Sequence, residues 1–161
     1  MTLELKKFDL RSISFKPNEN KGPVIVLIGR RDTGKSFLVR DLLFYQQDIP
    51  IGTVISGTEA GNGFYSNHVP KLFIHEEYNT AIIENILKRQ KQVLKQVKKE
   101  EQSFKKSNID PRAFVILDDC LYDNTWAKDK LMRLLFMNGR HWKIMLVITM
   151  QYPLGIPPNL R

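Results

Sequence analysis

Eight residues between an apolar run and a helical pattern have the spacing of a phosphate-binding loop. Gly29 to Ser36 (GRRDTGKS) fits the Walker A pattern GxxxxGK[ST]. In such a loop the backbone amides face phosphate oxygens, Lys35 reaches the β- and γ-phosphates, and Ser36 offers its hydroxyl to Mg²⁺. A chance glycine-rich turn is the alternative, which the position between strand and helix disfavours. The predicted ATP-binding residues are Gly29, Arg30, Arg31, Asp32, Thr33, Gly34, Lys35, Ser36 and Phe37.

Two adjacent aspartates follow a second apolar run. Residues 113–117 (AFVIL) end at Asp118 and Asp119. A carboxylate at the end of a buried strand can hold Mg²⁺, usually through water, so Asp118 is the predicted metal ligand with Ser36. Asp119 is the candidate for polarising an attacking water, which favours hydrolysis over transfer to a metabolite. Alternatively one aspartate caps the next helix, although Asp123 or Asn124 could do so instead.

Gln151 follows a third apolar run, residues 144–149 (IMLVIT). Its side-chain amide could hydrogen-bond both a γ-phosphate and the attacking water, and so respond to which nucleotide is bound. An ordinary polar residue at a strand end is an equally good interpretation of this position. By contrast, His68, His75, His141 and Cys120 show no metal-ligand spacing, and we interpret them as structural or surface residues.

The elements that would position these residues alternate along the chain. Residues 24–28, 51–56 and 72–74 also read as strands, while residues 37–45, 81–107 and 127–138 have helical patterns. Strands that are apolar on both faces predict an α/β fold with a mainly parallel sheet covered by helices. In such sheets ligands bind at the carboxyl ends of the strands, where the Walker A loop, the aspartate pair and Gln151 all fall.

Composition sets wider limits. The 161 residues fit one domain (1–161), with residues 81–107 as a long basic helical insertion, and residues 56–63 as a flexible loop. The charge of +8 suits a polyanionic partner such as nucleic acid, although many basic proteins bind none. No apolar run reaches bilayer length and the first residues lack a secretory signal, so we expect no membrane association. The single cysteine excludes an internal disulfide.

The motifs together resemble the FtsK–HerA superfamily of DNA-pumping P-loop ATPases, and most closely the poxvirus-type genome-packaging ATPases of nucleocytoplasmic large DNA viruses. The likeness covers residue 20 to the C-terminus. It rests on residues 139–153 (GRHWKIMLVITMQYP), on residues 57–65 with the following HVP, and on residues 114–120 (FVILDDC).

This resemblance implies a RecA/FtsK-like core in which Asp118 holds Mg²⁺, Asp119 activates water where relatives often have glutamate, and Gln151 acts as sensor. Arg140 aligns with the arginine that such enzymes insert into a neighbouring subunit's ATP site; Arg161 is a second candidate, and a surface cation is the alternative. The superfamily sheet continues with one more strand beside the Walker A strand. We expect this chain to lack it, and residues 8–15 could supply an edge strand instead.

The resemblance further implies a homo-oligomeric ring that moves double-stranded DNA without reading its sequence, contacts capsid proteins, and works in the host cytoplasm and the virion. The basic helix and the loop at 56–63 are the elements predicted to contact DNA or neighbouring subunits, unless the helix merely presents a solvated face. A nucleotide or small-molecule kinase is the alternative enzyme, with the basic helix as its lid. A nucleotide-binding scaffold without activity is the third interpretation.

Overall fold

A five-stranded parallel sheet forms the centre of the computed structural model, which describes residues 4, 7–104, 106–121 and 125–152. The strands are β1 (Val24–Ile28), β2 (Gly52–Ser56), β3 (Ile74–His75), β4 (Ala113–Asp118) and β5 (Ile144–Met150). They lie in the order β1-β5-β4-β2-β3, and every neighbouring pair is parallel. The predicted fold class is confirmed. In the described residues β1 is an edge strand, with only β5 beside it.

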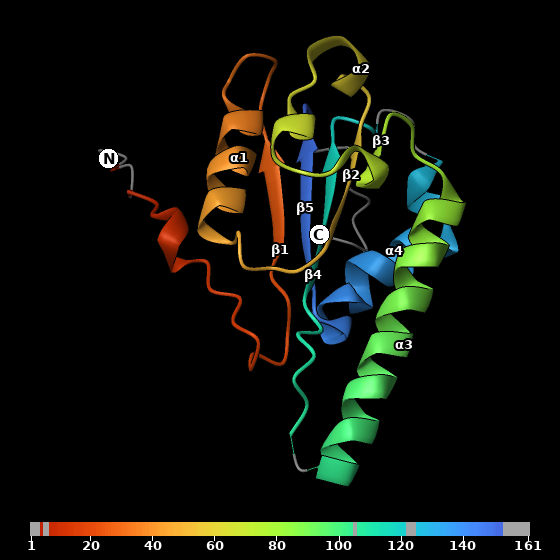
Figure 1. The fold of residues 1–161 in the computed structure, drawn as a ribbon. Coiled ribbons are helices and arrows are strands. Elements are labelled where there is room, and N and C mark those ends of the chain that lie inside the picture. The colour runs from red at the N-terminus through yellow and green to blue at the C-terminus, as the bar shows by residue number, and fades with distance from the viewer. Residues whose placement is uncertain (1–3, 5–6, 105, 122–124, 153–161) are drawn as a thin grey trace.

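Helices cover both faces of this sheet. The α-helices are α1 (Lys35–Tyr45), α2 (Glu59–Asn62), α3 (Thr80–Phe104) and α4 (Lys130–Asn138). Short 3-10 turns are η1 (Leu10–Ser12), η2 (Tyr65–Asn67), η3 (Lys71–Phe73), η4 (Trp126–Lys128) and η5 (Gly139–Trp142). Figure 1 shows α1 on one side of the strands and α3 with α4 on the other. None of the helices described is long and apolar enough to cross a membrane.

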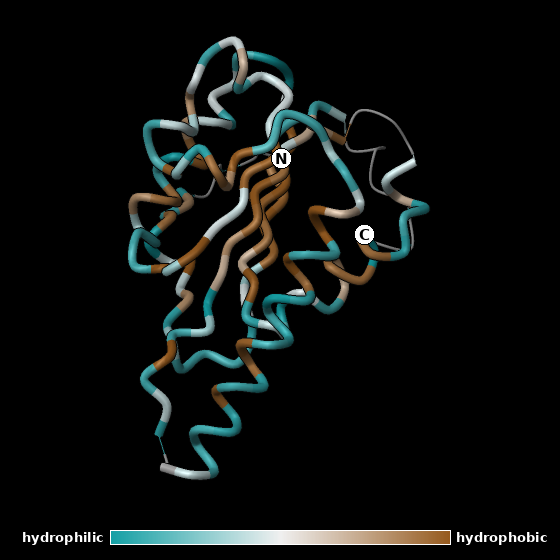
Figure 2. The backbone as a smooth tube through the Cα atoms, turned by 45° about the vertical axis from the view of Figure 1, so that its right-hand side comes forward, coloured by the Kyte–Doolittle hydropathy of each residue, from teal (hydrophilic) through white to brown (hydrophobic). Residues whose placement is uncertain are grey.

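Strands β4 and β5 are buried on both faces, as their unbroken apolar sequences predicted. Along β5, Met145 and Val147 belong to the core beneath α1, whereas Leu146 and Ile148 belong to the core beneath α3 and α4. Figure 2 shows these strands as a hydrophobic band inside a hydrophilic surface. Because successive side chains alternate between faces, one apolar strand serves two cores.

Helix α3 is longer than the sheet that it covers. In its first half Ile83 and Leu87 are buried against the sheet. Its second half extends past the strands and is mostly hydrophilic (Figures 1 and 2). There Lys91, Lys95 and Lys98 are exposed, and the Lys91 amine lies 5.0 Å from the Trp142 ring centre. The helix therefore contributes to the core at one end and carries a basic surface at the other.

Two local expectations were wrong. Residues 8–15 form no edge strand: the Asp9 carboxylate accepts a hydrogen bond from the Arg11 amide (2.9 Å) and closes the turn η1 instead. Phe15 then anchors this segment, since it is buried and its carbonyl accepts a 2.6 Å hydrogen bond from the Arg112 guanidinium. Residues 56–63 are not simply a flexible loop, because they contain α2 with Glu59 buried.

The cap of α4 is Asp129, whose carboxylate accepts from the Leu131 amide at 2.8 Å. This residue caps the helix that follows the aspartate pair, so neither Asp118 nor Asp119 is needed for that purpose. Asp123 and Asn124, the other caps considered from the sequence, lie outside the described residues.

One buried amide joins α3 to the amino ends of β4 and β5. The side-chain nitrogen of Gln90 donates to the carbonyl of Pro111 (2.8 Å) and to that of Trp142 (2.7 Å). Both carbonyls precede the strands that carry the aspartates and Gln151. Gln90 is fully buried, so no water can replace these two hydrogen bonds without a rearrangement.

We predict that Gln90→Leu destabilises the fold by roughly 2–4 kcal/mol, because it leaves two carbonyls without their donor while keeping the side-chain volume. Urea unfolding followed by circular dichroism measures this loss. The matched control is Gln92→Leu at an exposed position of the same helix, expected to change stability by less than about 0.5 kcal/mol. Equal effects of the two changes would contradict the importance of the Gln90 amide.

Candidate nucleotide-binding site

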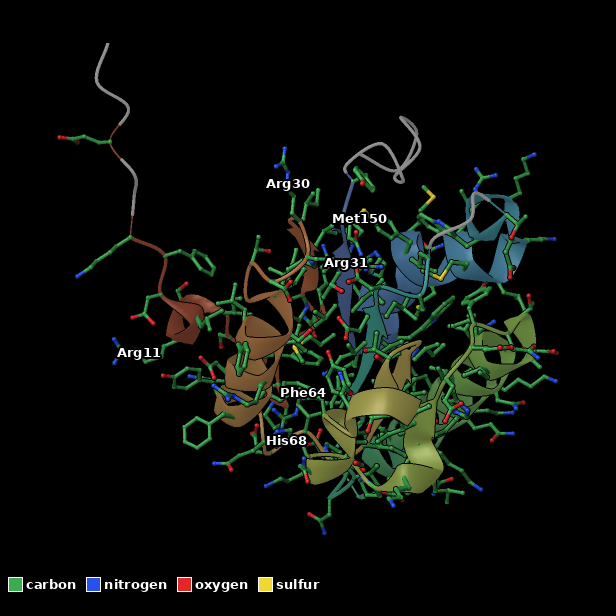
Figure 3. The ribbon with its side chains drawn as sticks, turned by 90° about the horizontal axis from the view of Figure 1, so that it is seen from above. Arg11, Arg30, Arg31, Phe64, His68 and Met150 are labelled. Carbon is green, nitrogen blue, oxygen red and sulfur yellow. The ribbon has the colours of Figure 1, made fainter. Side chains whose placement is uncertain are left out.

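The Walker A loop, the aspartate pair and Gln151 gather at the carboxyl edge of the sheet, which Figure 3 views from above. Pairing aligns Ile28 with Met150 and Asp118 with Thr149, so β1, β4 and β5 end side by side. The Gly29 amide extends this alignment by donating to the Met150 carbonyl at 3.1 Å. The start of the Walker A loop and the end of β5 are therefore neighbours, with β4 directly beyond.

The Walker A loop has the backbone that its glycines permit. Gly34 has a φ of 84° immediately before α1, a conformation that side chains with a Cβ rarely adopt. A Cβ on Gly29 would lie 2.7 Å from the Thr33 hydroxyl, which donates to the Arg30 carbonyl at 2.8 Å. Residues 30–33 are exposed, and in Figure 3 Arg30 points away from the strands. The loop therefore keeps its tip open to solvent.

Lys35 lies folded against this loop. Its amine donates to the carbonyls of Gly29 (2.8 Å) and Arg30 (2.9 Å), and only 9% of its side chain is exposed. The same amine lies 3.9 Å from a carboxylate oxygen of Asp119. The Lys35 amine thus lies between the phosphate loop and the aspartate pair. In this position it could bind the anionic phosphate oxygens of a nucleotide.

Asp118 is a buried carboxylate held by hydroxyl groups from both neighbouring strands. Thr149 donates to its Oδ1 at 2.6 Å, and Ser56 donates to its Oδ2 at the long distance of 3.4 Å. The side chain is 5% exposed. A buried carboxylate with one strongly bonded and one weakly bonded oxygen has capacity left for a metal or for metal-bound water.

Asp119 adopts a positive φ of 47°. Its amide donates to the Thr149 hydroxyl at 3.0 Å, so one threonine fixes both members of the pair. Non-glycine residues with positive φ are uncommon and cluster at functional sites. The turn brings the half-buried carboxylate of Asp119 beside Lys35.

The remaining predicted residues divide between the two ends of the sheet. Gln151 directly follows β5, is half-buried, and lies next to the Walker A loop through Met150. Phe37 is exposed on α1 and packs edge-to-face on Phe64, with ring centres 6.0 Å apart. Arg140 lies in η5, before β5, so it is exposed at the opposite end and does not join its own subunit's site. Arg161 lies outside the described residues.

These donors suit Mg²⁺ bound together with a nucleotide better than a metal held by protein alone. Within the described parts of the chain, no three His, Cys, Asp or Glu side chains are grouped closely enough to hold a metal ion. Mg²⁺ is usually held by one or two protein oxygens, substrate phosphates and water. The Ser36 hydroxyl and the free capacity of Asp118 match that requirement. These two side chains are therefore suitable ligands for the predicted Mg²⁺, bound together with ATP.

Several functional side chains were missed from the sequence. Thr149 and Ser56 hold Asp118. Ser56 is the last residue of β2 and Thr149 the penultimate residue of β5, and polar residues are ordinary at such positions. Thr149 carries the one hydroxyl in the run 144–150, a weak signal that could have identified it.

Cys120 is buried, and burial with the nearby Asp118 charge raises its thiol pKa to about 12. It therefore stays protonated and is no nucleophile.

Comparison with known proteins identifies the family. The poxvirus A32 protein family matches residues 7–161. Protein L437 of Acanthamoeba polyphaga mimivirus is 42% identical over 160 residues, covering 98% of this chain and 53% of that protein. Protein 075L of Invertebrate iridescent virus 6 is 40% identical over 163 residues, covering 98% and 58%. The chain thus spans a little over half the length of these relatives.

Two solved structures share the fold. ATPases 2 and 3 of EssC from Geobacillus thermodenitrificans superpose with a TM-score of 0.60 at 19% identity, covering 86% of this chain and 30% of that one. The pCW3 conjugation coupling protein TcpA with ATPγS gives 0.56 at 20% identity, covering 83% and 44%. Together with the viral relatives and the match over residues 7–161, they confirm the resemblance predicted from the motifs: the chain belongs to the poxvirus A32 protein family.

Proposed function

We propose that this chain is the ATP-hydrolysing domain of a motor that moves double-stranded DNA during viral genome packaging. One observation carries the proposal: the Walker A lysine lies 3.9 Å from Asp119, beside an Asp118 carboxylate that Thr149 holds in place. A phosphate-binding cation facing two carboxylates is suited to hydrolysis, because one carboxylate can position metal and the other water.

The residues of the site divide the work. Loop amides and Lys35 bind the triphosphate, with the amine exchanging its two carbonyl partners for phosphate oxygens. Ser36 and Asp118 would hold Mg²⁺, which would supply positive charge to neutralise the phosphate groups. Asp119, fixed by its amide hydrogen bond to Thr149, orients the attacking water. Gln151, at the end of β5, is placed to contact the same water and the γ-phosphate.

The position of Arg140 supports a shared site. It lies at the amino end of β5, whereas Lys35 and Asp119 lie at the carboxyl edge, so any role for Arg140 in ATP hydrolysis requires a neighbouring subunit's site. A head-to-tail ring joins two different surface patches of successive subunits, so it could place Arg140 of one subunit beside the nucleotide site of the next. In that arrangement the arginine would stabilise the charge of the transition state in trans.

Duplex DNA is the proposed cargo. The chain is basic, and the exposed lysines on the outer half of α3 offer a surface for phosphate backbones, whose contacts carry no sequence information. The family match to a poxvirus protein and the large-DNA-virus relatives support a packaging role, with capsid proteins as partners and the infected cell and virion as its locations.

One prediction of this function concerns turnover. ATP hydrolysis, measured as phosphate release, is expected to rise when long duplex DNA is added. Lys35→Ala should abolish nucleotide binding, because the loop loses its cation. Asp119→Asn should keep ATP binding but lower kcat by about 10²–10⁴-fold, since an amide cannot act as base. Asparagine tolerates a positive φ, so the backbone remains as it is.

Surface controls separate these effects from general damage. Lys71→Ala and Asp41→Asn change a lysine and an aspartate elsewhere and should leave turnover unchanged. Turnover that ignores DNA and needs a small phosphoryl acceptor would replace the motor with a kinase. Nucleotide binding without any turnover would instead support a scaffold.

A further prediction tests the shared site. Arg140→Ala is expected to bind ATP normally and to hydrolyse it about 10³-fold or more slowly. Mixing it with Lys35→Ala should restore activity, because one partner supplies the ATP site and the other the arginine. With random assembly of equal amounts, roughly one quarter of the interfaces combine both intact residues.

The matched control is Arg133→Ala, which removes an exposed arginine from α4. It should hydrolyse ATP at the wild-type rate. A mixture of Arg140→Ala and Lys35→Ala that remains inactive, although both variants assemble, would contradict the action of Arg140 in trans.

A further inference from the structure

A small hollow lies between α3 and the outer strands of the sheet, and we call it the α3 slot. It has a volume of about 210 Å³ and is lined by Gly52 and Thr53 at the start of β2. The short strand β3 does not pair with these two residues, because it pairs only with Val54 and Ile55. Figure 1 shows α3 on this side of the strands. The apolar walls are Ile51, Phe73, Ile82, Ile86, Ala113 and Phe114.

One cationic side chain lines the slot without an anionic partner. Arg89 of α3 is half-buried, and this burial lowers the pKa of its guanidinium. Among the described residues it forms no ion pair, and its side chain donates one hydrogen bond, to the Gln90 side-chain oxygen at 2.6 Å. The buried Arg112, by contrast, has ion pairs with Asp48 and Asp110. A guanidinium has five N–H donors, so Arg89 can still bind an anion.

The apolar walls decide which anion suits the slot. A phosphate dianion is strongly hydrated, and moving it from water into apolar surroundings is costly. A carboxylate carries a single charge, and its two oxygens match the planar fork of a guanidinium. The volume is below the roughly 300 Å³ of pockets that enclose drug-sized ligands, so it suits one anchoring residue of a longer chain. The last residue of a protein chain presents both a carboxylate and a side chain.

We propose that the α3 slot binds the C-terminal residue of a partner protein, with its carboxylate on Arg89 and a leucine-sized apolar side chain against Ile82 and Ile86. The charge of Arg89 and the apolar walls of the slot match these two groups of one residue. Thr53 and Asn85 also line the slot and supply polar groups for the last peptide bond of the bound chain.

The slot is separate from the candidate nucleotide-binding site. It lies beside Gly52, at the amino end of β2, whereas Asp118 aligns with Ser56 at the carboxyl end of that strand. A partner held in the slot therefore leaves the phosphate loop open. The inference is independent of ATP hydrolysis, and its test measures binding alone.

The test is binding of the peptide acetyl-Gly-Ser-Gly-Leu, with a free C-terminal carboxylate, to the complete chain. Isoleucine methyl signals are followed by NMR during the titration, because Ile82 and Ile86 would contact the bound leucine. The same peptide with a C-terminal amide should bind at least about 10-fold more weakly, the range for hydrogen bonds to a charged group. Arg89→Gln should cause a similar loss, and Arg89→Lys a smaller one, because lysine keeps the charge without the fork.

The matched control is Lys88→Gln, which removes one positive charge at the adjacent exposed position, where Lys88 pairs with Glu84 at 2.7 Å. Its affinity for the free-acid peptide should equal that of the wild type. Unfolding midpoints check the fold of each variant, and the comparison of acid with amide on the wild type needs no substitution.

Four results would overturn the proposal. These are equal affinity for acid and amide, unchanged Ile82 and Ile86 signals at millimolar peptide, equal losses in Arg89→Gln and Lys88→Gln, and larger shifts with inorganic phosphate than with the peptide. A C-terminally amidated peptide with an internal glutamate is the last comparison. If it bound as tightly as the free acid, the chain end would not be the occupant.

Discussion

The hydrogen bond from Thr149 to Asp118 is the contact on which the arrangement of the site depends. It is 2.6 Å long, buried, and joins the last residue of β4 to the penultimate residue of β5. A carboxylate in such surroundings is stable only when its oxygens have partners. The same threonine oxygen accepts a hydrogen bond from the Asp119 amide, so one side chain contacts both aspartates of the pair. The Asp119 amide also lies 3.3 Å from the backbone carbonyl of Thr149, so the side chain and the backbone of this threonine hold the turn together.

The apolar character of β4 and β5 explains why polar groups gather at the two edges of the sheet where these strands begin and end. Because both strands are buried on two faces, charged side chains can reach solvent or polar partners only at the ends of the strands. At the amino edge, Gln90 and Arg112 bind carbonyl groups of the entering segments. At the carboxyl edge, the corresponding positions hold the Walker A loop and the aspartates. Polar residues at the amino edge of the sheet therefore stabilise the fold, whereas those at the carboxyl edge form the candidate nucleotide-binding site.

Sequence was sufficient for β1, β2, β4 and β5, for the parallel sheet and for the phosphate loop, because each depends on local pattern: an apolar run, or GxxxxGKS at fixed spacing. The strand expected at 72–74 was only partly right, since residues 72 and 73 belong to η3 and β3 is Ile74–His75. Sequence was insufficient where a side chain acts on residues distant in the chain. Thr149 donates a hydrogen bond to Asp118, which lies 31 positions earlier in the sequence, and no local pattern around either residue predicts this contact. Residues 8–15 alternate like a strand, yet the local bond between Asp9 and Arg11 prevails. The role of Arg140 remains a prediction, since a single chain cannot display a site built by two.

The positive φ of Asp119 has a consequence for how sequences of this family should be aligned and scored. Backbones in this region accept glycine, asparagine and aspartate readily, and accept longer or β-branched side chains with strain. Substitution tables treat aspartate and glutamate as nearly equivalent, which assumes a relaxed backbone. Here the exchange would add backbone strain as well as change the reach of the acid, although Lys143 shows that a long side chain can adopt this conformation. A glutamate at the aligned position of another protein would therefore place its carboxylate differently from Asp119, at a cost in backbone strain if the turn is kept.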